Sequence, residues 1–261
     1  MLRFDHYPGN PHATLVLLHG LFGSAKNFAS IASDLTDVAT VYAYDARNHC
    51  GSSHIATHTL SVLTEDLAAF VRERQISAPV LMGHSMGGLT VMNFARLYPA
   101  VPRALIAVDI APRTYAPAHA QEIAAQKIDV SQFASRREID AEMAKILPDA
   151  TIRSFLQMNL ARDAGGAFCW QNNIAAIEKS PERTVFPHFE PPLFSGPVLA
   201  VRGLASDFVT DADAERMKSA FPQLSLESLP GAGHWLHHTH RDALIGFVRG
   251  FLQRLLSSSK H

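Results

Sequence analysis

The order of apolar and polar positions along the chain predicts an α/β fold, because short apolar runs alternate with amphipathic stretches. Parallel strands are buried on both faces, so in sequence they form continuous apolar runs and not alternating ones. Six runs fit this description and are the expected strands: residues 15–18, 38–44, 80–82, 104–108, 198–201 and 224–229. The stretches between them repeat apolar residues every three or four positions, as expected for flanking helices with one buried face.

The long segment from Pro112 to Pro192 departs from this alternation. It contains no convincing strand, and its periodicity predicts helices over residues 118–127, 136–146, 150–160 and 170–179. The segment lies between two expected strands of one sheet. We therefore expect an α/β core with a mostly parallel central sheet, formed by residues 1–111 and 193–261, and a helical cap of residues 112–192 inserted in it.

The composition narrows the class of protein without selecting a function. The 261 residues, 47% of them hydrophobic, suffice for a full core in one large domain. A net charge of −1 lacks the basic excess typical of nucleic-acid-binding proteins. Cys50 and Cys169 form no disulfide framework or zinc motif, and no apolar run near the start approaches the ~20 residues of a membrane span. With no secretory signal in the short polar N-terminus, we expect a cytoplasmic, enzyme-sized domain of unknown oligomeric state.

The motif that carries chemistry is Gly83-His84-Ser85-Met86-Gly87. It follows the expected strand at 80–82 and precedes a helix, which is the context that a G-x-S-x-G nucleophile requires. Glycines at the flanking positions let the strand and helix backbones pass closely, so that the serine hydroxyl projects above the sheet. Ser85 is therefore the expected nucleophile, and the Met86 N–H at the helix start is an expected oxyanion donor.

A serine hydroxyl needs a neighbouring base, and His234 stands out among the 14 histidines. It lies in Gly233-His234-Trp235, between the last expected strand and the last helix, at the same edge of the sheet as Ser85. The alternative is a purely structural role, in which His234 only caps the last helix. Other histidines follow it closely, but no acidic residue accompanies them as in H-E-x-x-H, so we expect no metal. Phosphate-loop and dinucleotide fingerprints are also missing from the sequence, and no cofactor is expected.

Five motifs occur in order along the chain: His19-Gly20-Leu21-Phe22-Gly23-Ser24, Asp45-Ala46-Arg47-Asn48-His49, Gly83-His84-Ser85-Met86-Gly87-Gly88, Val108-Asp109-Ile110-Ala111-Pro112 and Gly233-His234-Trp235-Leu236-His237. Together they resemble the α/β-hydrolase superfamily and, more narrowly, the YbfF-type bacterial esterases and their abhydrolase-domain relatives. The resemblance runs from about Leu15 to the C-terminal helix. Cys50 departs from it, since the family usually has glycine there, and we expect this to alter a loop and not the chemistry.

Two aspartates compete for the role of the catalytic acid. In most α/β-hydrolases the acid stands three residues after the glycine that follows the penultimate strand. Counted from Gly203, that position is Ser206, with Asp207 one residue further. Asp109 instead ends a strand that should lie about 4.8 Å from the nucleophile strand, which would bring its carboxylate to the nucleophile. The resemblance implies the same acid, with Ser206 supporting it, so we prefer Asp109 and keep Asp207 as the alternative.

A second oxyanion donor and a substrate pocket complete the expected site. The resemblance places the donor at the Leu21 N–H, with the Phe22 N–H as the near alternative. Phe22 and Trp235 flank catalytic residues in sequence and are expected pocket residues, together with Phe155 and Met158 of the cap. A cap must also bury its own apolar face, so part of its aromatic and methionine residues is expected to serve packing alone.

The predicted activity is ester hydrolysis through an acyl-Ser85 intermediate, with His234 acting as base and then as acid. The resemblance implies small acyl esters as substrates, with acyl thioesters such as acyl-CoA as an extension. One alternative is other serine-triad chemistry, namely C–C bond hydrolysis, perhydrolysis or acyl transfer. Another is a non-catalytic binding protein with this fold. Dehalogenases and epoxide hydrolases need a carboxylate nucleophile, and Ser85 argues against both.

Overall fold

The computed structural model describes residues 1–116 and 118–258 and is built around one seven-stranded sheet. The strand order is β1-β3-β2-β4-β5-β8-β9, and all neighbours are parallel except β1 and β3. The strands are β1 (Phe4–Tyr7), β2 (Thr14–Leu18), β3 (Thr40–Tyr44), β4 (Val80–His84), β5 (Ala104–Val108), β8 (Pro197–Gly203) and β9 (Gln223–Leu229). The predicted mostly parallel sheet and its six predicted strands are thus confirmed.

Strand β1 is the one strand of this sheet that the apolar pattern does not reveal. It pairs antiparallel with β3, with Phe4 opposite Tyr44. Because β1 lies at the edge of the sheet, its side chains stay partly exposed, and Asp5 and His6 interrupt its apolar positions. A four-residue strand of this kind has the same composition as a polar loop.

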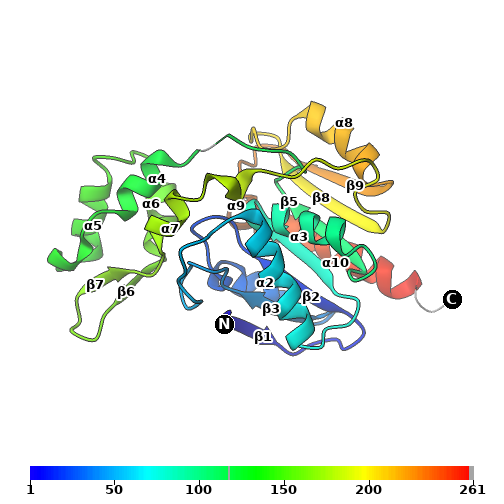
Figure 1. The fold of residues 1–261 in the computed structure, drawn as a ribbon, viewed down its shortest axis with the longest axis horizontal. Helices are drawn as coiled ribbons and strands as arrows, with labels where there is room; N and C mark the ends of the chain where they lie inside the picture. The colour runs from blue at the N-terminus through cyan, green and yellow to red at the C-terminus, as the bar shows by residue number, and fades with distance from the viewer. Residues whose placement is uncertain (117, 259–261) are drawn as a thin grey trace.

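Helices cover both faces of the sheet (Figure 1). The helices of the core are η1 (Ala25–Phe28), α1 (Ala29–Asp34), α2 (Leu60–Glu73), α3 (Met86–Leu97), α8 (Asp211–Ala220), α9 (Leu236–Thr239) and α10 (Arg241–Ser258). Val16 of β2 packs in a cluster with α2, α3 and α8, whereas Leu15 and Leu17 pack with α1 and α10. Both side-chain directions are therefore buried, which explains the unbroken apolar runs of the central strands. Among the described helices, none is both long and apolar enough to cross a membrane.

Residues 112–192 join β5 to β8 and form what we call the cap, which stands to one side of the sheet (Figure 1). Its elements are α4 (Ala120–Gln126), η2 (Val130–Gln132), α5 (Arg136–Met143), α6 (Ala150–Gln157), β6 (Leu160–Arg162), β7 (Phe168–Trp170), α7 (Ile174–Glu178) and η3 (Pro181–Thr184). The four predicted helices are present but shorter than predicted. The last begins only at Ile174, because Asn173 caps it by accepting the Ala176 N–H at 3.3 Å.

The expectation that the cap contains no strand is wrong, since β6 and β7 pair as an antiparallel hairpin. The Asp163 carboxylate shapes the turn between them by accepting the N–H groups of Gly165 and Ala167 at 2.8 and 3.0 Å. Gly166 follows in the left-handed region with φ 85°. Three-residue strands offer too few positions for a periodic pattern, so the Asp-x-Gly-Gly turn is the signal that sequence reasoning missed.

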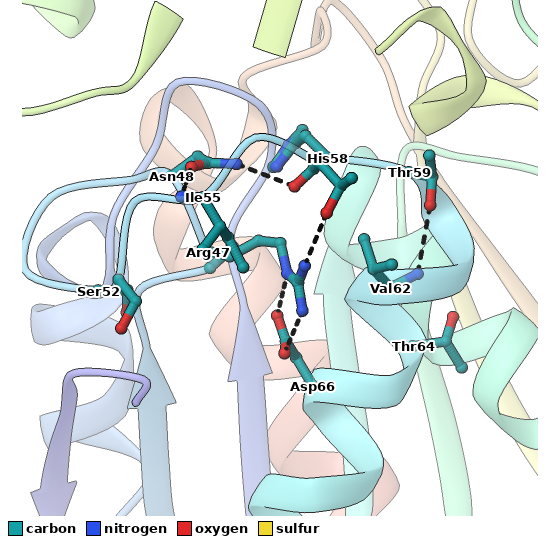
Figure 2. A network of polar contacts seen from close by, with 12 residues as sticks. Arg47, Asn48, Ser52, Ile55, His58, Thr59, Val62, Thr64 and Asp66 are labelled. Atoms are coloured by element: carbon teal, nitrogen blue, oxygen red, sulfur yellow. Dashed lines mark hydrogen bonds and ion pairs between the residues drawn. The ribbon is translucent and has the colours of Figure 1, made fainter. Parts of the chain in front are cut away.

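Polar contacts hold the loop between β3 and α2 (Figure 2). Arg47 binds the Asp66 carboxylate of α2 with two nitrogens, at 2.5 and 2.7 Å. Asn48 donates from Nδ2 to the Thr57 carbonyl at 3.1 Å and accepts the Ile55 N–H at 2.8 Å. The two ends of this long connection are therefore tied to each other and to the helix that follows.

The same loop, which belongs to the core, forms an interface with the cap. The Asn173 N–H donates to the Asn48 carbonyl at 2.8 Å. The His58 N–H donates to Ser180 Oγ at 3.1 Å, and the fully buried His58 ring has no hydrogen-bond partner among the described residues. The cap is thus hydrogen-bonded to the core along this loop.

Candidate active site

Ser85 stands at the sharp turn between β4 and α3. Its φ of 52° and ψ of −119° are angles that a non-glycine residue adopts only under constraint. The constraint is crowding, because a Cβ on Gly83 would lie 2.2 Å from the Gly87 backbone. A Cβ on Gly87 would in turn lie 2.4 Å from the Leu18 carbonyl oxygen. The G-x-S-x-G sequence therefore folds into the predicted strand–turn–helix arrangement, with Ser85 8% exposed.

Asp109 and His234 meet at the same edge of the sheet. Asp109 follows β5, the neighbour of β4, and is fully buried. His234 follows β9, and its Nδ1 lies 2.8 Å from Asp109 Oδ2. The carboxylate also accepts the Gly203 N–H at 2.9 Å and the Ser206 hydroxyl at 2.5 Å. With Nδ1 donating to a carboxylate, Nε2 of His234 is the ring atom left to act as a base.

The order of the strands explains why Asp109, and not Asp207, reaches the histidine. Strand β5 lies between β4 and β8, so Asp109 is flanked by Ser85 on one side and by the loop after β8 on the other. Within that loop Ser206 turns its hydroxyl onto Asp109, whereas Asp207 is exposed. The structure therefore brings together Asp109, Ser206 and His234 and leaves Asp207 outside.

The imidazole of His234 is fixed by packing and is largely desolvated. Phe208 stacks on it with ring centroids 3.6 Å apart and an interplanar angle of 14°. His84 Nε2 donates to the His234 carbonyl at 2.8 Å. Burial lowers the pKa of His234 below its ordinary value of 6.5, while the hydrogen bond to Asp109 acts in the opposite direction. The ring is therefore neutral at pH 7, as a base must be.

The three backbone amides expected near the reacting carbonyl differ in availability. Among the described residues, neither the Leu21 N–H nor the Met86 N–H is used in a hydrogen bond. Met86 opens α3, so its N–H has no partner within the helix. The alternative amide is already bound, because the Phe22 N–H donates to His49 Nε2 at 3.1 Å. Leu21 and Met86 are thus the two amides with a free N–H.

A small chamber lies between the cap and the core at this edge. Ser85 and His234 line it, together with three of the predicted pocket residues, Phe22, Phe155 and Trp235. Its volume of about 20 Å³ is enough for about one water molecule. The free space beside Ser85 is therefore small.

A second, larger cavity adjoins the chamber on its outer side. Phe155 and Trp235, whose ring centroids are 6.1 Å apart, line both spaces. The outer cavity measures about 540 Å³, and the fourth predicted pocket residue, Met158, lines this cavity and not the chamber. Other cap aromatics pack into the cap's own apolar cluster, as part of them was expected to: Phe133, Phe168 and Trp170.

Three residues near the site were not assigned a role from the sequence. Phe208 stacks on His234, His49 accepts the Phe22 N–H, and Asn159 donates from Nδ2 to the Phe22 carbonyl at 2.6 Å. His49 belongs to one of the five motifs, which was the available signal. Asn159 comes from the cap, where the sequence shows no motif.

Comparison with known proteins identifies the family. Residues 13–241 match the model of the alpha/beta hydrolase fold family, and the chain belongs to that family. It is 34% identical to the sn-1-specific diacylglycerol lipase ABHD11 of Xenopus tropicalis over 262 residues, which cover 95% of this chain and 82% of the relative. Its identity to the esterase YbfF of Escherichia coli is 28%, over 92% of this chain and 93% of that protein.

A solved structure extends the similarity to three dimensions. A marine microorganism esterase aligns with a TM-score of 0.90 and 35% identity, over 96% of this chain and 98% of that one. These findings confirm the predicted fold and the predicted resemblance. The chain is an α/β hydrolase of the esterase and lipase type.

Proposed function

We propose that this protein is a serine carboxylesterase that hydrolyses small acyl esters through an acyl-Ser85 intermediate. The observation that carries the proposal is the 2.8 Å contact of His234 Nδ1 with the buried Asp109 carboxylate, in a histidine that lines the same chamber as Ser85. His234 Nε2 takes the proton of Ser85 as Oγ attacks the ester carbonyl carbon, and then gives it to the departing alcohol. Water then attacks the acyl carbon, with His234 again acting as base and acid, and the Ser85 hydroxyl is restored.

The oxyanion of each tetrahedral intermediate needs donors that are already in place. We assign this role to the free N–H groups of Leu21 and Met86, and the dipole of α3 adds to the second. Each such donor stabilises the transition state by roughly 3–4 kcal/mol. Ser206 supports the arrangement by donating to Asp109 from the side opposite to the nucleophile strand.

The cavities support substrates of modest size. The outer cavity of about 540 Å³ has the volume of a typical small-molecule site, and it adjoins the chamber through Phe155 and Trp235. The sn-1-specific diacylglycerol lipases among the relatives favour oxygen esters as the main class. Acyl thioesters such as acyl-CoA form the same acyl-serine and are the second class that we propose. The cytoplasmic location expected from the sequence stays a prediction.

Labelling with a fluorophosphonate tests the proposal directly, because this reagent reacts only with an activated serine. Intact mass spectrometry should show one adduct on the wild-type protein and none on Ser85→Ala. Thermal unfolding of both proteins is the control for folding. Folded wild-type protein that takes up no adduct would favour the non-catalytic alternative, and an adduct on Ser85→Ala would move the nucleophile to another residue.

The lowered pKa of His234 determines the expected pH dependence. The base must be neutral, so kcat/KM should hold its plateau down through pH 6.5 and fall only at lower pH. The measurement is kcat/KM for one soluble ester from about pH 5 to about pH 8. An acid limb with its midpoint above 6.5 would show that the Asp109 interaction outweighs burial, contrary to this expectation.

A further inference from the structure

The Phe22 backbone, next to the proposed donor Leu21, is held from two sides. Its N–H donates to His49 Nε2 at 3.1 Å, and its carbonyl accepts from Asn159 Nδ2 at 2.6 Å. Phe22 has a φ of 60°, a left-handed conformation that is unfavourable for a bulky side chain. His49 and Asn159 are buried, with exposed fractions of 0% and 1%. Two buried side chains therefore compensate for a strained turn.

His49 is prepared to accept this hydrogen bond. Its Nδ1 lies 3.0 Å from the Arg47 carbonyl, so Nδ1 carries the proton and Nε2 has a free lone pair. Burial, and next the neighbouring His19 and His58, hold the pKa of His49 well below its ordinary value. The ring therefore stays neutral and remains an acceptor throughout the neutral range.

The side-chain amide of Asn159, a cap residue, is also oriented by a hydrogen bond. Its Oδ1 accepts from Cys50 Sγ at 3.3 Å, which leaves Nδ2 to face the Phe22 carbonyl. Burial raises the pKa of Cys50 to about 11, so the thiol keeps its proton and remains the donor. Cys50 itself has a φ of 43°, which fits the glycine usual in the resembling family. The cysteine thus adds a contact to Asn159 that a glycine would lack.

We propose that Asn159 is a positioning residue for the oxyanion hole, acting with His49 through the Phe22 backbone. Asn159 holds the carbonyl of the Phe22–Gly23 peptide, and this unit shares the Phe22 Cα with the Leu21–Phe22 peptide, whose N–H is held by His49. The Leu21–Phe22 peptide in turn shares the Leu21 Cα with the unit that carries the Leu21 N–H. A tilt passed along these two joints swings the Leu21 N–H away from the developing oxyanion. Because Asn159 lies on the cap, the hole is complete only while the cap is docked on the core. This inference rests on the proposed function, since it assigns a role within the same site.

The test compares Asn159→Ala with Asn172→Ala. Asn172 is a matched control, because it is also a buried cap asparagine whose side chain contacts Cys50, accepting its N–H at 3.4 Å. Among the described residues its side chain forms no hydrogen bond with Phe22. For a soluble acetate ester, Asn159→Ala should lower kcat about tenfold to hundredfold with little change in KM, the scale expected from misplacing a catalytic group by about 1 Å. Asn172→Ala should leave kcat within about twofold of the wild type.

A trifluoromethyl ketone provides the readout that a merely structural role would not change. Ser85 Oγ adds to its carbonyl carbon, the C=O π bond becomes an oxyanion, and the serine proton passes to His234. Its inhibition constant should rise in Asn159→Ala by the same factor by which kcat falls. Should Asn159→Ala fail to fold, Cys50→Gly is the second variant. It suits the φ of 43°, removes the Sγ contact to Asn159, and should lower kcat by a smaller factor.

The outcomes separate this inference from the proposed function. Wild-type protein that neither hydrolyses esters nor takes up fluorophosphonate overturns both. Active wild-type protein overturns the positioning role alone in any of three cases. In the first case, Asn159→Ala and Asn172→Ala have the same kcat. In the second, Asn159→Ala changes KM alone. In the third, Asn159→Ala does not fold and Cys50→Gly has the kcat of the wild type.

Discussion

Replacing Asp109 with asparagine is expected to lower kcat/KM by about four orders of magnitude while the protein stays folded. The carboxylate accepts from His234, Ser206 and Gly203 at 2.5–2.9 Å. An asparagine retains the shape and lacks the charge, so it neither holds the proton on Nδ1 nor stabilises the imidazolium that forms when Ser85 attacks. Ester hydrolysis by purified protein, at a concentration set by absorbance and with circular dichroism as the check of folding, measures the loss.

Asp207→Asn is the matched control for this experiment, because it makes the same chemical change one residue after Ser206 on an exposed side chain. Its kcat/KM should stay within about twofold of the wild type, as for surface substitutions in general. An Asp207→Asn variant with the larger loss would transfer the role of the acid to Asp207 and overturn the assignment to Asp109.

Gly83→Ala is expected to have the largest effect on stability, lowering the free energy of unfolding by more than about 4 kcal/mol or preventing folding. Its Cβ would lie 2.2 Å from the Gly87 carbonyl carbon and oxygen and 2.4 Å from the Gly88 nitrogen. All three are backbone atoms, and they belong to the start of α3, so relief requires the helix to move away from β4. Urea unfolding monitored by circular dichroism measures the change.

Gly246→Ala is the control for Gly83→Ala, because it also adds one methyl group to a glycine. Gly246 is an exposed residue of α10, and a Cβ there meets no heavy atom of the described chain within 4 Å. Alanine favours helix, so this variant should gain about 0.5–1 kcal/mol. Equal stability of the two alanine variants would contradict the crowding argument at the nucleophile turn.

The core of the fold was predictable because burial on both faces gives its strands a distinctive composition. Leu15, Val16 and Leu17 lie on alternate faces, and each face has its own helices, so all three had to be apolar. The edge strand β1 and the β6–β7 hairpin have no such requirement. They are short, partly exposed and set by hydrogen bonds, including those of Asp163, which leave no periodic signal.

The candidate site also has a part that could be predicted from the sequence and a part that could not. Ser85 and Asp109 directly follow β4 and β5, and His234 lies in the loop between β9 and α9, so their meeting at one edge of a parallel sheet follows from topology. The position of Met158 outside the chamber, and the contact of Asn159 with the Phe22 carbonyl, depend on how the cap docks. No local pattern in the sequence encodes that docking.

The buried histidines give this protein a built-in sensitivity to protons. Burial lowers the pKa of His19, His49 and His84 below the ordinary value. It lowers the pKa of His58 and of His237 to about 3. An unfolded chain takes up protons on these rings as the pH falls below 6.5, whereas the folded chain does not. His58 and His237, whose pKa values in the folded chain are about 3, each weaken the native state by up to about 1.4 kcal/mol for every pH unit between 6.5 and about 3. The protein is therefore expected to keep its stability at neutral pH and to lose it progressively as the pH falls below 6.5.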